Sequence, residues 1–143
     1  MPDDSSPVAH TKHGDLTLDQ IADMMPGMAR LMVEISDRCW VLYYAARGGN
    51  WELARHEFSE MRKTLRMSAI MRPKYKEAME AFDAECMVPL QDALRTGDFY
   101  DFEAHFIRAT ERANVYHREF GYNYIEWQLP DEPPLHLRLR GEE

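Results

Sequence analysis

Cysteine is scarce in this sequence, which contains only Cys39 and Cys86. Two cysteines so far apart give no disulfide framework of the kind that small secreted domains use. Residues 1–7 are acidic and lack the positive and apolar regions of a secretory signal. No uninterrupted apolar run approaches the ~18 residues that a membrane-spanning helix needs. These absences predict a soluble, cytoplasmic protein that does not associate with a membrane.

Positive charge is also in short supply. The 143 residues include 17 Lys and Arg against 25 Asp and Glu, which gives a formal net charge of −8. No basic stripe is evident along the chain, so a nucleic acid is not expected as a partner. Hydrophobic residues make up 45% of the chain, which is a globular composition. The length suits one domain with its own core.

The motifs of conventional enzymes are missing as well. A ferritin-like di-iron site needs Glu-x-x-His on two helices. That motif does not occur, and Glu103 and His105 have the wrong spacing for it. Neither a Gly-rich phosphate loop nor a Gly-x-Ser-x-Gly elbow is present. We therefore do not expect an enzyme of a conventional kind.

Helical periodicity is what the sequence does contain. Apolar residues recur at steps of three and four along four segments, and each such pattern gives a helix one apolar stripe. The expected helices span residues 26–47, 51–69, 73–95 and 98–120. Pro89 is expected to kink the third of them. The stripes predict an all-α fold, an antiparallel up-down-up-down four-helix bundle within residues 17–128.

Short connections support the antiparallel order. Residues 48–50 and residues 96–98 each combine a helix-ending glycine with a side chain that can cap the next helix. Such tight reversals place consecutive helices side by side in opposite directions. Thr17 and Gln20 form a capping-box pattern that predicts a short helical turn before the first long helix.

The two ends of the chain lack an apolar period. Residues 1–16 are expected to form a flexible tail. Residues 129–143 are expected to be irregular because they include Pro130, Pro133 and Pro134. No strand-like alternation and no Asn-Gly hairpin signal is present, so no strand is expected.

His117 is the residue of the fourth expected helix that is least typical of a hydrophobic core. By helical spacing it turns toward the interior, with Ala113 one turn before it and Phe120 one turn after it. One interpretation is a core histidine that is satisfied by a carbonyl or by Asn114. The residue pattern alone favours that interpretation over a ligand-binding one.

The residues around His117 resemble those of a known family. Residues 110–117 read Thr-Glu-Arg-Ala-Asn-Val-Tyr-His, and Gly121 and the pair Tyr124-Ile125 follow. This string is similar to the last helix of cytochrome c′-type four-helix proteins. In particular it resembles a branch whose haem motif reads Cys-Asn-x-Cys-His before a glycine and an aromatic-Ile pair. A fainter resemblance extends into the first two expected helices.

The sequence departs from that motif at its chemical centre. Ala113 and Tyr116 occupy the two attachment positions, so neither thioether bond to haem can form. The resemblance matches only the histidine that ligates the haem iron, which is His117 here. Because covalent haem attachment belongs to exported proteins, this loss agrees with the expected cytoplasmic location.

The resemblance implies an apolar pocket at one end of the bundle. The residues that it places around this pocket are His117, Ala113, Tyr116, Phe120, Met28, Met32, Ile35, Phe58 and Trp127. Haem could be held there non-covalently, with His117 as the only metal ligand. The alternative for the same residues is ordinary core packing. The ring of Tyr116 also competes for the space that a porphyrin would need.

Three functions therefore stay open. The first is a non-enzymatic protein that binds a hydrophobic small molecule, haem or another flat ligand, beside His117. The second is a cofactor-free relative that acts as a structural or homodimerising module through the first two helices. Its interaction surface would consist of Trp40, Tyr43, Tyr44 and Trp51. The third is an enzyme with His117 as general acid or base, for which no activating partner is evident. A cavity of ~300 Å³ or more beside His117 would favour the first.

Overall fold

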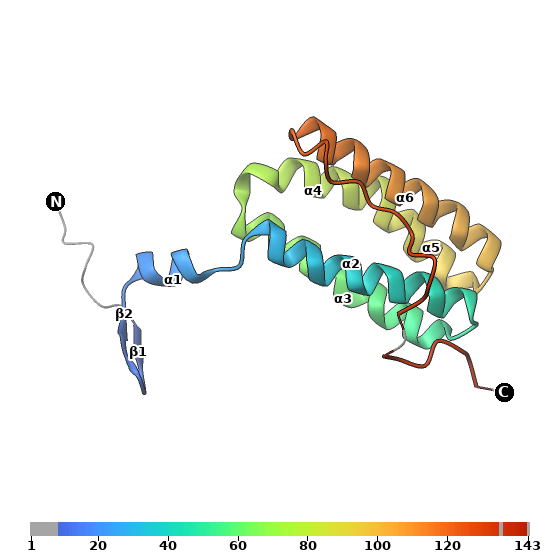
Figure 1. Cartoon of the computed structure of the whole chain (residues 1–143), viewed down its shortest axis with the longest axis horizontal. Coiled ribbons are helices and arrows are strands. Elements are labelled where there is room, and N and C mark those ends of the chain that lie inside the picture. The colour runs from blue at the N-terminus through green and yellow to red at the C-terminus, as the bar shows by residue number, and fades with distance from the viewer. Residues whose placement is uncertain (1–8, 135, 143) are drawn as a thin grey trace.

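Most of the chain is helical in the computed structural model, which describes residues 9–134 and 136–142 (Figure 1). The all-α prediction is confirmed at this level, with one small strand pair as the exception. No helix within the described residues combines the length and the hydropathy that crossing a membrane requires. Residues 1–8 of the predicted flexible tail lie outside the described residues.

The start of the described chain forms a β-hairpin, so the prediction that no strand is present is wrong here. Strand β1 (Ala9–Thr11) pairs antiparallel with strand β2 (Gly14–Leu16) across a tight turn. Gly14 adopts a φ of 133°, which favours glycine. Oδ1 of Asp15 lies 2.6 Å from Nδ1 of His10 on the facing strand. Strands of three mostly polar residues carry too little alternation to be recognised in a sequence.

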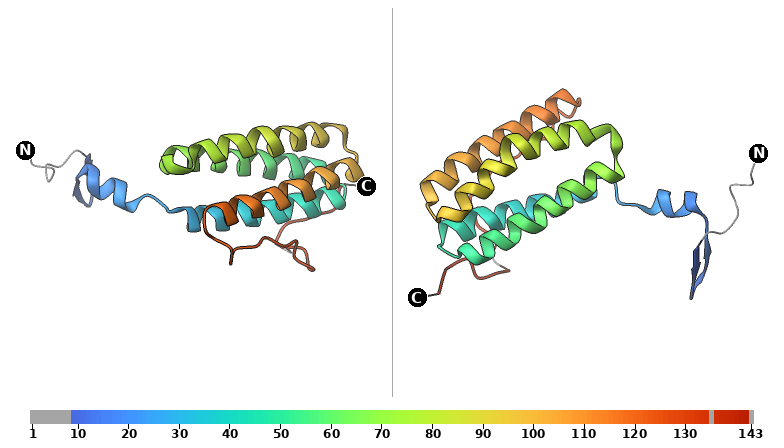
Figure 2. Two further views of the ribbon diagram at one scale, coloured as in Figure 1. Left: turned by 90° about the horizontal axis from the view of Figure 1, so that it is seen from above. Right: turned by 180° about the vertical axis from the view of Figure 1, so that it is seen from behind.

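Helix α1 (Leu18–Met24) follows the hairpin, and together they form an arm, residues 9–24, that projects from the body (Figures 1 and 2). The predicted capping box opens α1. The Thr17 hydroxyl accepts a hydrogen bond from the Gln20 amide at 3.1 Å, and the Gln20 side chain accepts one from the Thr17 amide at 2.9 Å. No residue of α1 is buried, and the arm joins the body at Pro26.

Helices α2 (Met28–Arg47) and α3 (Trp51–Met71) form an antiparallel pair. The turn between them follows the predicted pattern. Gly49 adopts a φ of 80°, and the Asn50 side chain accepts a hydrogen bond from the Leu53 amide at 3.2 Å. The apolar stripes of both helices face into the molecule.

The third expected helix is divided by a π-helical turn directly before Pro89. Proline has no N–H for the carbonyl four residues earlier, and its ring crowds that carbonyl. In the π turn the Val88 amide donates to the Asp83 carbonyl instead, which widens the backbone at this point. The segment consists of η1 (Pro73–Tyr75), α4 (Lys76–Phe82), η2 (Asp83–Met87) and α5 (Val88–Thr96).

Helix α6 (Phe99–Glu119) runs back along α4 and α5 to form the second helix pair. Gly97 ends α5 with a φ of 67°, and Asp98 caps α6 as predicted. The two pairs pack against each other, with α2 beside α6 and α3 beside α4 and α5 (Figure 2). Leu42 and Phe102 are completely buried in the core between them.

The chain after α6 is irregular and mostly exposed, but hydrogen bonds hold it to the body. In Figure 1 this segment runs back over α6 and α2 toward the turn between α2 and α3. The Tyr44 hydroxyl donates to the Pro130 carbonyl. The Asn50 side chain donates to the Arg138 carbonyl at 2.9 Å. These contacts tie the segment to the first helix pair.

Candidate functional site

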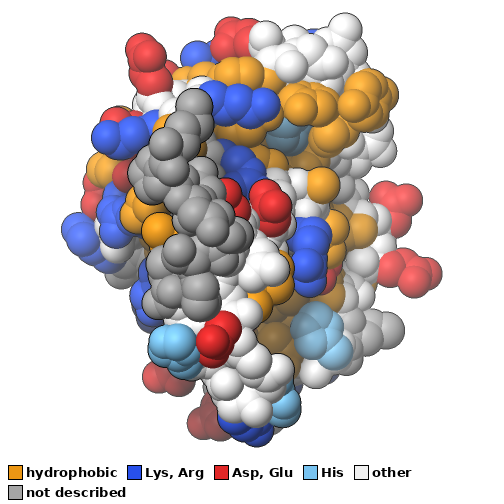
Figure 3. All heavy atoms as spheres, turned by 90° about the vertical axis from the view of Figure 1, so that its left-hand side faces the viewer, with side chains coloured by type: hydrophobic (Ala, Val, Ile, Leu, Met, Phe, Trp, Pro, Cys, Tyr) orange, Lys and Arg blue, Asp and Glu red, His pale blue; other side chains and the backbone are white. Residues whose placement is uncertain are grey.

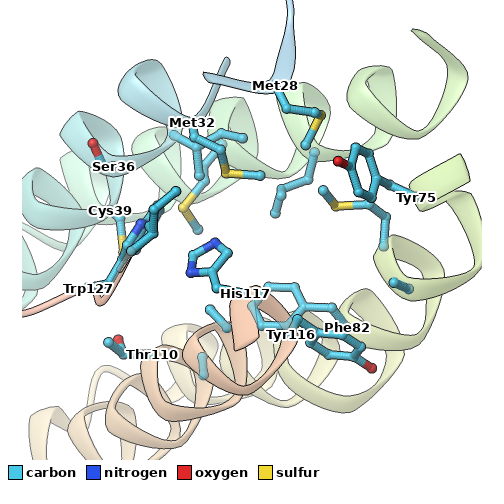
Figure 4. Close-up of a pocket in the computed structure, with 18 of the residues that line it drawn as sticks. Met28, Met32, Ser36, Cys39, Tyr75, Phe82, Thr110, Tyr116, His117 and Trp127 are labelled. Carbon is cyan, nitrogen blue, oxygen red and sulfur yellow. The ribbon is translucent and has the colours of Figure 1, made fainter. Parts of the chain in front are cut away.

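A cavity of about 460 Å³ lies between the two helix pairs, at the end of the molecule where α2 begins and α6 ends (Figure 4). This volume falls within the range of small-molecule sites. The lining residues are Met28, Ala29, Met32, Val33, Ile35, Ser36, Cys39, Met61, Leu65, Tyr75, Ala78, Met79, Phe82, Met87, Leu90, Phe106, Ala109, Thr110, Ala113, Tyr116, His117, Phe120, Tyr122, Ile125 and Trp127.

The lining is almost entirely apolar. Methionine, aliphatic and aromatic side chains supply most of it, and no Asp, Glu, Lys or Arg from the described part of the chain contributes. Apart from tyrosine hydroxyls, one thiol and the Trp127 indole, its polar members are Ser36, Thr110 and His117. Figure 3 faces this end of the molecule and shows hydrophobic side chains gathered in its upper part. Such a lining suits a largely hydrophobic ligand.

His117 lies in the last turn of α6, and its ring points into the cavity (Figure 4). The helix ends two residues later. Gly121, with a φ of 85°, turns the chain so that the Tyr122 amide donates to the His117 carbonyl at 2.8 Å. The imidazole lies 6.1 Å from the ring of Trp127, between centroids. The end of α6 therefore fixes the position of the His117 side chain.

Nδ1 of His117 is buried and has no hydrogen-bond partner among the described residues. Buried polar atoms are nearly always paired, so an unpaired one is a place where a ligand can supply the partner. Burial lowers the pKa of this imidazole, and the backbone of Ile125 acts in the opposite direction. The ring is neutral near pH 7, which is the form that ligates a metal.

Asn114 holds Trp127 beside the cavity. The Asn114 side-chain oxygen accepts a hydrogen bond from the Trp127 amide at 2.8 Å, and its nitrogen donates to the Trp127 carbonyl at 3.1 Å. The indole packs on Trp40, with ring centroids 5.5 Å apart. The interpretation in which Asn114 satisfies the ring of His117 is therefore wrong, because the amide is used by the backbone of Trp127.

Tyr116 lines the wall of the cavity without filling it. Its ring meets Phe82 edge-on at 6.2 Å and lies 4.6 Å from the guanidinium carbon of Arg112. Its hydroxyl is 3.4 Å from Oε1 of Glu85, and Oε2 of the same carboxylate accepts a hydrogen bond from Arg112 at 2.8 Å. Burial raises the pKa of Tyr116, and the Glu85 charge adds to that shift. These contacts draw the ring toward α4 and η2 and leave space beside His117.

Eight of the nine residues expected around the pocket line the cavity. These are His117, Ala113, Tyr116, Phe120, Met28, Met32, Ile35 and Trp127. Phe58 does not. It is 3% exposed, packs in the core and borders a separate depression between α3 and α5. Met61 and Leu65 are the α3 residues that face the cavity instead.

The sequence interpretation missed the wall that α3, α4 and α5 contribute. Met61, Met79 and Met87 stand in or beside the predicted apolar stripes, but nothing in the stripes separates a core position from a cavity position.

Cys39 also lines the cavity. Burial raises the pKa of its thiol to about 12, so Cys39 stays protonated and acts as a small apolar group.

The described residues contain no group of three or more His, Cys, Asp or Glu side chains that could hold a metal ion. No protein-family model matches the chain, and no curated protein or solved structure matches it either.

Proposed function

We propose that this protein binds a flat hydrophobic ligand in the cavity beside His117 and does not catalyse a reaction. The observation that carries the proposal is about 460 Å³ of apolar space next to a buried imidazole nitrogen that has no partner in the described part of the chain. This space is far larger than the water-sized voids that core packing leaves, and it opens to solvent, so a ligand can enter it. Apolar burial would supply most of the affinity, and His117 would supply the directional contact.

We also propose that the two helix pairs constitute an up-down-up-down four-helix bundle of the cytochrome c′ type. Three features support this: the tight turns at Gly49 and Gly97, the contacts of α2 with α6 and of α3 with α4 and α5, and a histidine in the last turn of the last helix. In that arrangement His117 would face a cavity at the end of the bundle, as the resemblance implies.

Haem is the first ligand to test, because the residues present fit it. His117 offers an unpaired nitrogen in a neutral ring, and the apolar walls suit a macrocycle. Met28 and Met32 lie across the cavity from His117 (Figure 4). No cation of the described chain lines the cavity, so the propionates would have to extend toward solvent. When bound, haem would supply an iron for small-ligand binding or electron transfer.

Neither alternative function is supported by a specific observation. A general acid or base at His117 needs an activating partner, and Nδ1 has none among the described residues. The aromatic side chains expected on a dimer surface pack within the chain. Tyr43 and Tyr44 are buried, and Trp40 contacts Trp127. A homodimer through α2 and α3 stays a prediction that sedimentation can test.

Hemin titration of the purified protein, followed in the Soret region, tests the haem version. The parent protein is expected to give a saturable band at one hemin per chain. His117→Ala should lose the spectrum of histidine-ligated iron. His105→Ala is the matched control, because His105 is on the same helix but does not line the cavity. It should behave like the parent protein.

Two results would count against haem: no saturable band, or the same spectrum in His117→Ala as in the parent protein. If hemin and apolar fluorescent probes all fail to bind, the ligand-binding proposal itself falls.

A further inference from the structure

A second depression, about 330 Å³ in volume, lies between α3 and α5. Five cations line it: Arg55, Arg62, Lys63, Arg66 and Arg95. No Asp or Glu of the described chain lines it. Because the whole protein has only 17 basic residues and a net charge of −8, five of those 17 in one place is a pronounced concentration of positive charge.

The spacing of these cations on α3 works against the stability of the free protein. Arg55, Arg62 and Arg66 recur at steps of seven and four, which places them on one face, and like charges four residues apart on a helix repel. A third depression, bordered by α2 and α3, shows the usual compensation, because Arg38 there is paired with Glu57 at 3.2 Å. Within the described residues, only Arg62 of the second depression has a comparable partner, Asp83, which lies outside the lining.

Two of the arginines are held in fixed orientations. Arg62 donates to both carboxylate oxygens of Asp83, at 2.7 and 2.8 Å, and to the side chain of Gln91 at 3.0 Å. The Arg62 side chain is only 13% exposed. Arg55 donates through Nε to the carbonyl of Leu94 at 3.2 Å. A guanidinium that is already oriented loses less conformational freedom when it binds an oxyanion.

The charge balance indicates what the depression can accept. Arg55 and Arg66 form no ion pair within the described residues, while Lys63 and Arg95 pair only with exposed carboxylates on their own helices. Exposed pairs of this kind are weak and exchange readily. An anion of about two to four negative charges would therefore be neutralised without breaking the part-buried pair of Arg62 and Asp83.

We propose that this depression, the α3–α5 cleft, binds a small molecule through a diphosphate group. Each phosphate group concentrates up to about two negative charges and three acceptor oxygens. A diphosphate therefore supplies the required charge in a small volume. One arginine side chain can also donate two parallel hydrogen bonds to two phosphate oxygens. A long polyanion would also meet the acidic surface beyond the cleft, because the protein as a whole carries a net charge of −8.

Calorimetric titration with inorganic pyrophosphate at a series of fixed ionic strengths tests this proposal independently of ligand binding beside His117. One site per chain is expected, with an affinity that falls as salt is added. Arg66→Gln changes an exposed side chain, so the fold should tolerate it. It is expected to weaken binding about tenfold, the effect of losing one charge-assisted contact. Arg55→Gln should give a comparable loss.

Arg118→Gln is the matched control, because it removes the same charge from an exposed position on α6 that is outside the cleft. It should leave the affinity unchanged. A titration with ADP distinguishes the two sources of a diphosphate group. If ADP binds more tightly than pyrophosphate, the ligand is a nucleoside diphosphate. If ADP binds more weakly, the ligand is the free anion. The proposal is overturned if pyrophosphate does not bind, if sulfate or a short single-stranded oligonucleotide binds as tightly, or if Arg118→Gln weakens binding as much as Arg66→Gln.

Discussion

Asn114 is 9% exposed, and both polar groups of its side-chain amide bond to the main chain of Trp127. These two bonds set the point at which the segment after α6 passes beside the cavity. They also satisfy an amide and a carbonyl of an irregular stretch, where no helix or strand supplies partners. The position of the Trp127 ring, and with it one wall of the cavity, depends on this one side chain.

Replacing Asn114 with alanine should therefore destabilise the protein and loosen Trp127. We expect a loss of about 1–3 kcal/mol in the free energy of unfolding, because two main-chain groups lose their partners in a half-buried site. Urea denaturation measures the loss, and a red shift of tryptophan emission reports the loosening. Asn123→Ala, at an exposed position nearby, is the control and should change stability by less than about 0.5 kcal/mol. Equal effects in the two variants would contradict the role of Asn114.

The ring of His117 should titrate below its ordinary pKa of 6.5, because burial disfavours the imidazolium. The folded state thus binds this proton more weakly than the unfolded chain does. The stability that depends on a neutral His117 is fully present above pH 6.5 and is lost as the pH falls through the lower, folded-state pKa. An NMR titration of the ring measures the midpoint. A midpoint at or above 6.5 would show that burial does not dominate the pKa of this ring.

At the scale of elements, the long helices could be predicted because local signals and the apolar stripes agree. The turn at Gly49 and Asn50 and the cap at Asp98 are examples in which glycine, cap and periodicity point to the same boundary. The hairpin of β1 and β2 could not be predicted, since its short polar strands lack alternation. Pro89 indicated that the third helix would be irregular at this point. Whether the irregularity is a kink or a π turn depends on tertiary packing.

The arm should contribute little to the stability of the body. No residue of α1 is buried, so removing residues 1–25 is expected to change the free energy of unfolding by less than about 0.5 kcal/mol. Removing residues 130–143 is the comparison. It deletes the partners of Tyr44 and Asn50, and a loss of about 1 kcal/mol or more is expected. Thermal or urea unfolding of the two truncated proteins checks the contrast, and a larger loss for the amino-terminal truncation would contradict it.

At the scale of the whole molecule, most of the cavity lining could be anticipated but the cavity itself could not. The volume of a cavity is the space between the helices minus the volume of the side chains that fill it. No local sequence pattern determines that remaining volume. Tyr116 shows why: its size suggested that it would occupy the space, but Glu85 and Arg112 hold it at the wall. Phe58 faces elsewhere because α3 presents Met61 to the cavity.

The α3–α5 cleft was also missed, for a different reason. The sequence was expected to carry no basic stripe, yet Arg55, Arg62 and Arg66 share one face of α3. Acidic residues lie between these arginines in the sequence, so the clustering of positive charge on one helix face is not evident along the chain. Arg95 joins the group only when α5 packs on α3, so the concentration of charge is a property of the folded chain.

The most direct test of the central claim is to fill the cavity and measure ligand binding. Ala113 lines the cavity, so Ala113→Phe should occupy it, whereas Ala104→Phe adds the same ring at an exposed position of α6. Fluorescence titration with N-phenyl-1-naphthylamine is expected to show one saturable site in the parent protein and in Ala104→Phe. Ala113→Phe, with unchanged helical content, should bind at least about tenfold more weakly. Equal binding by all three proteins, or none by the parent, would contradict the account.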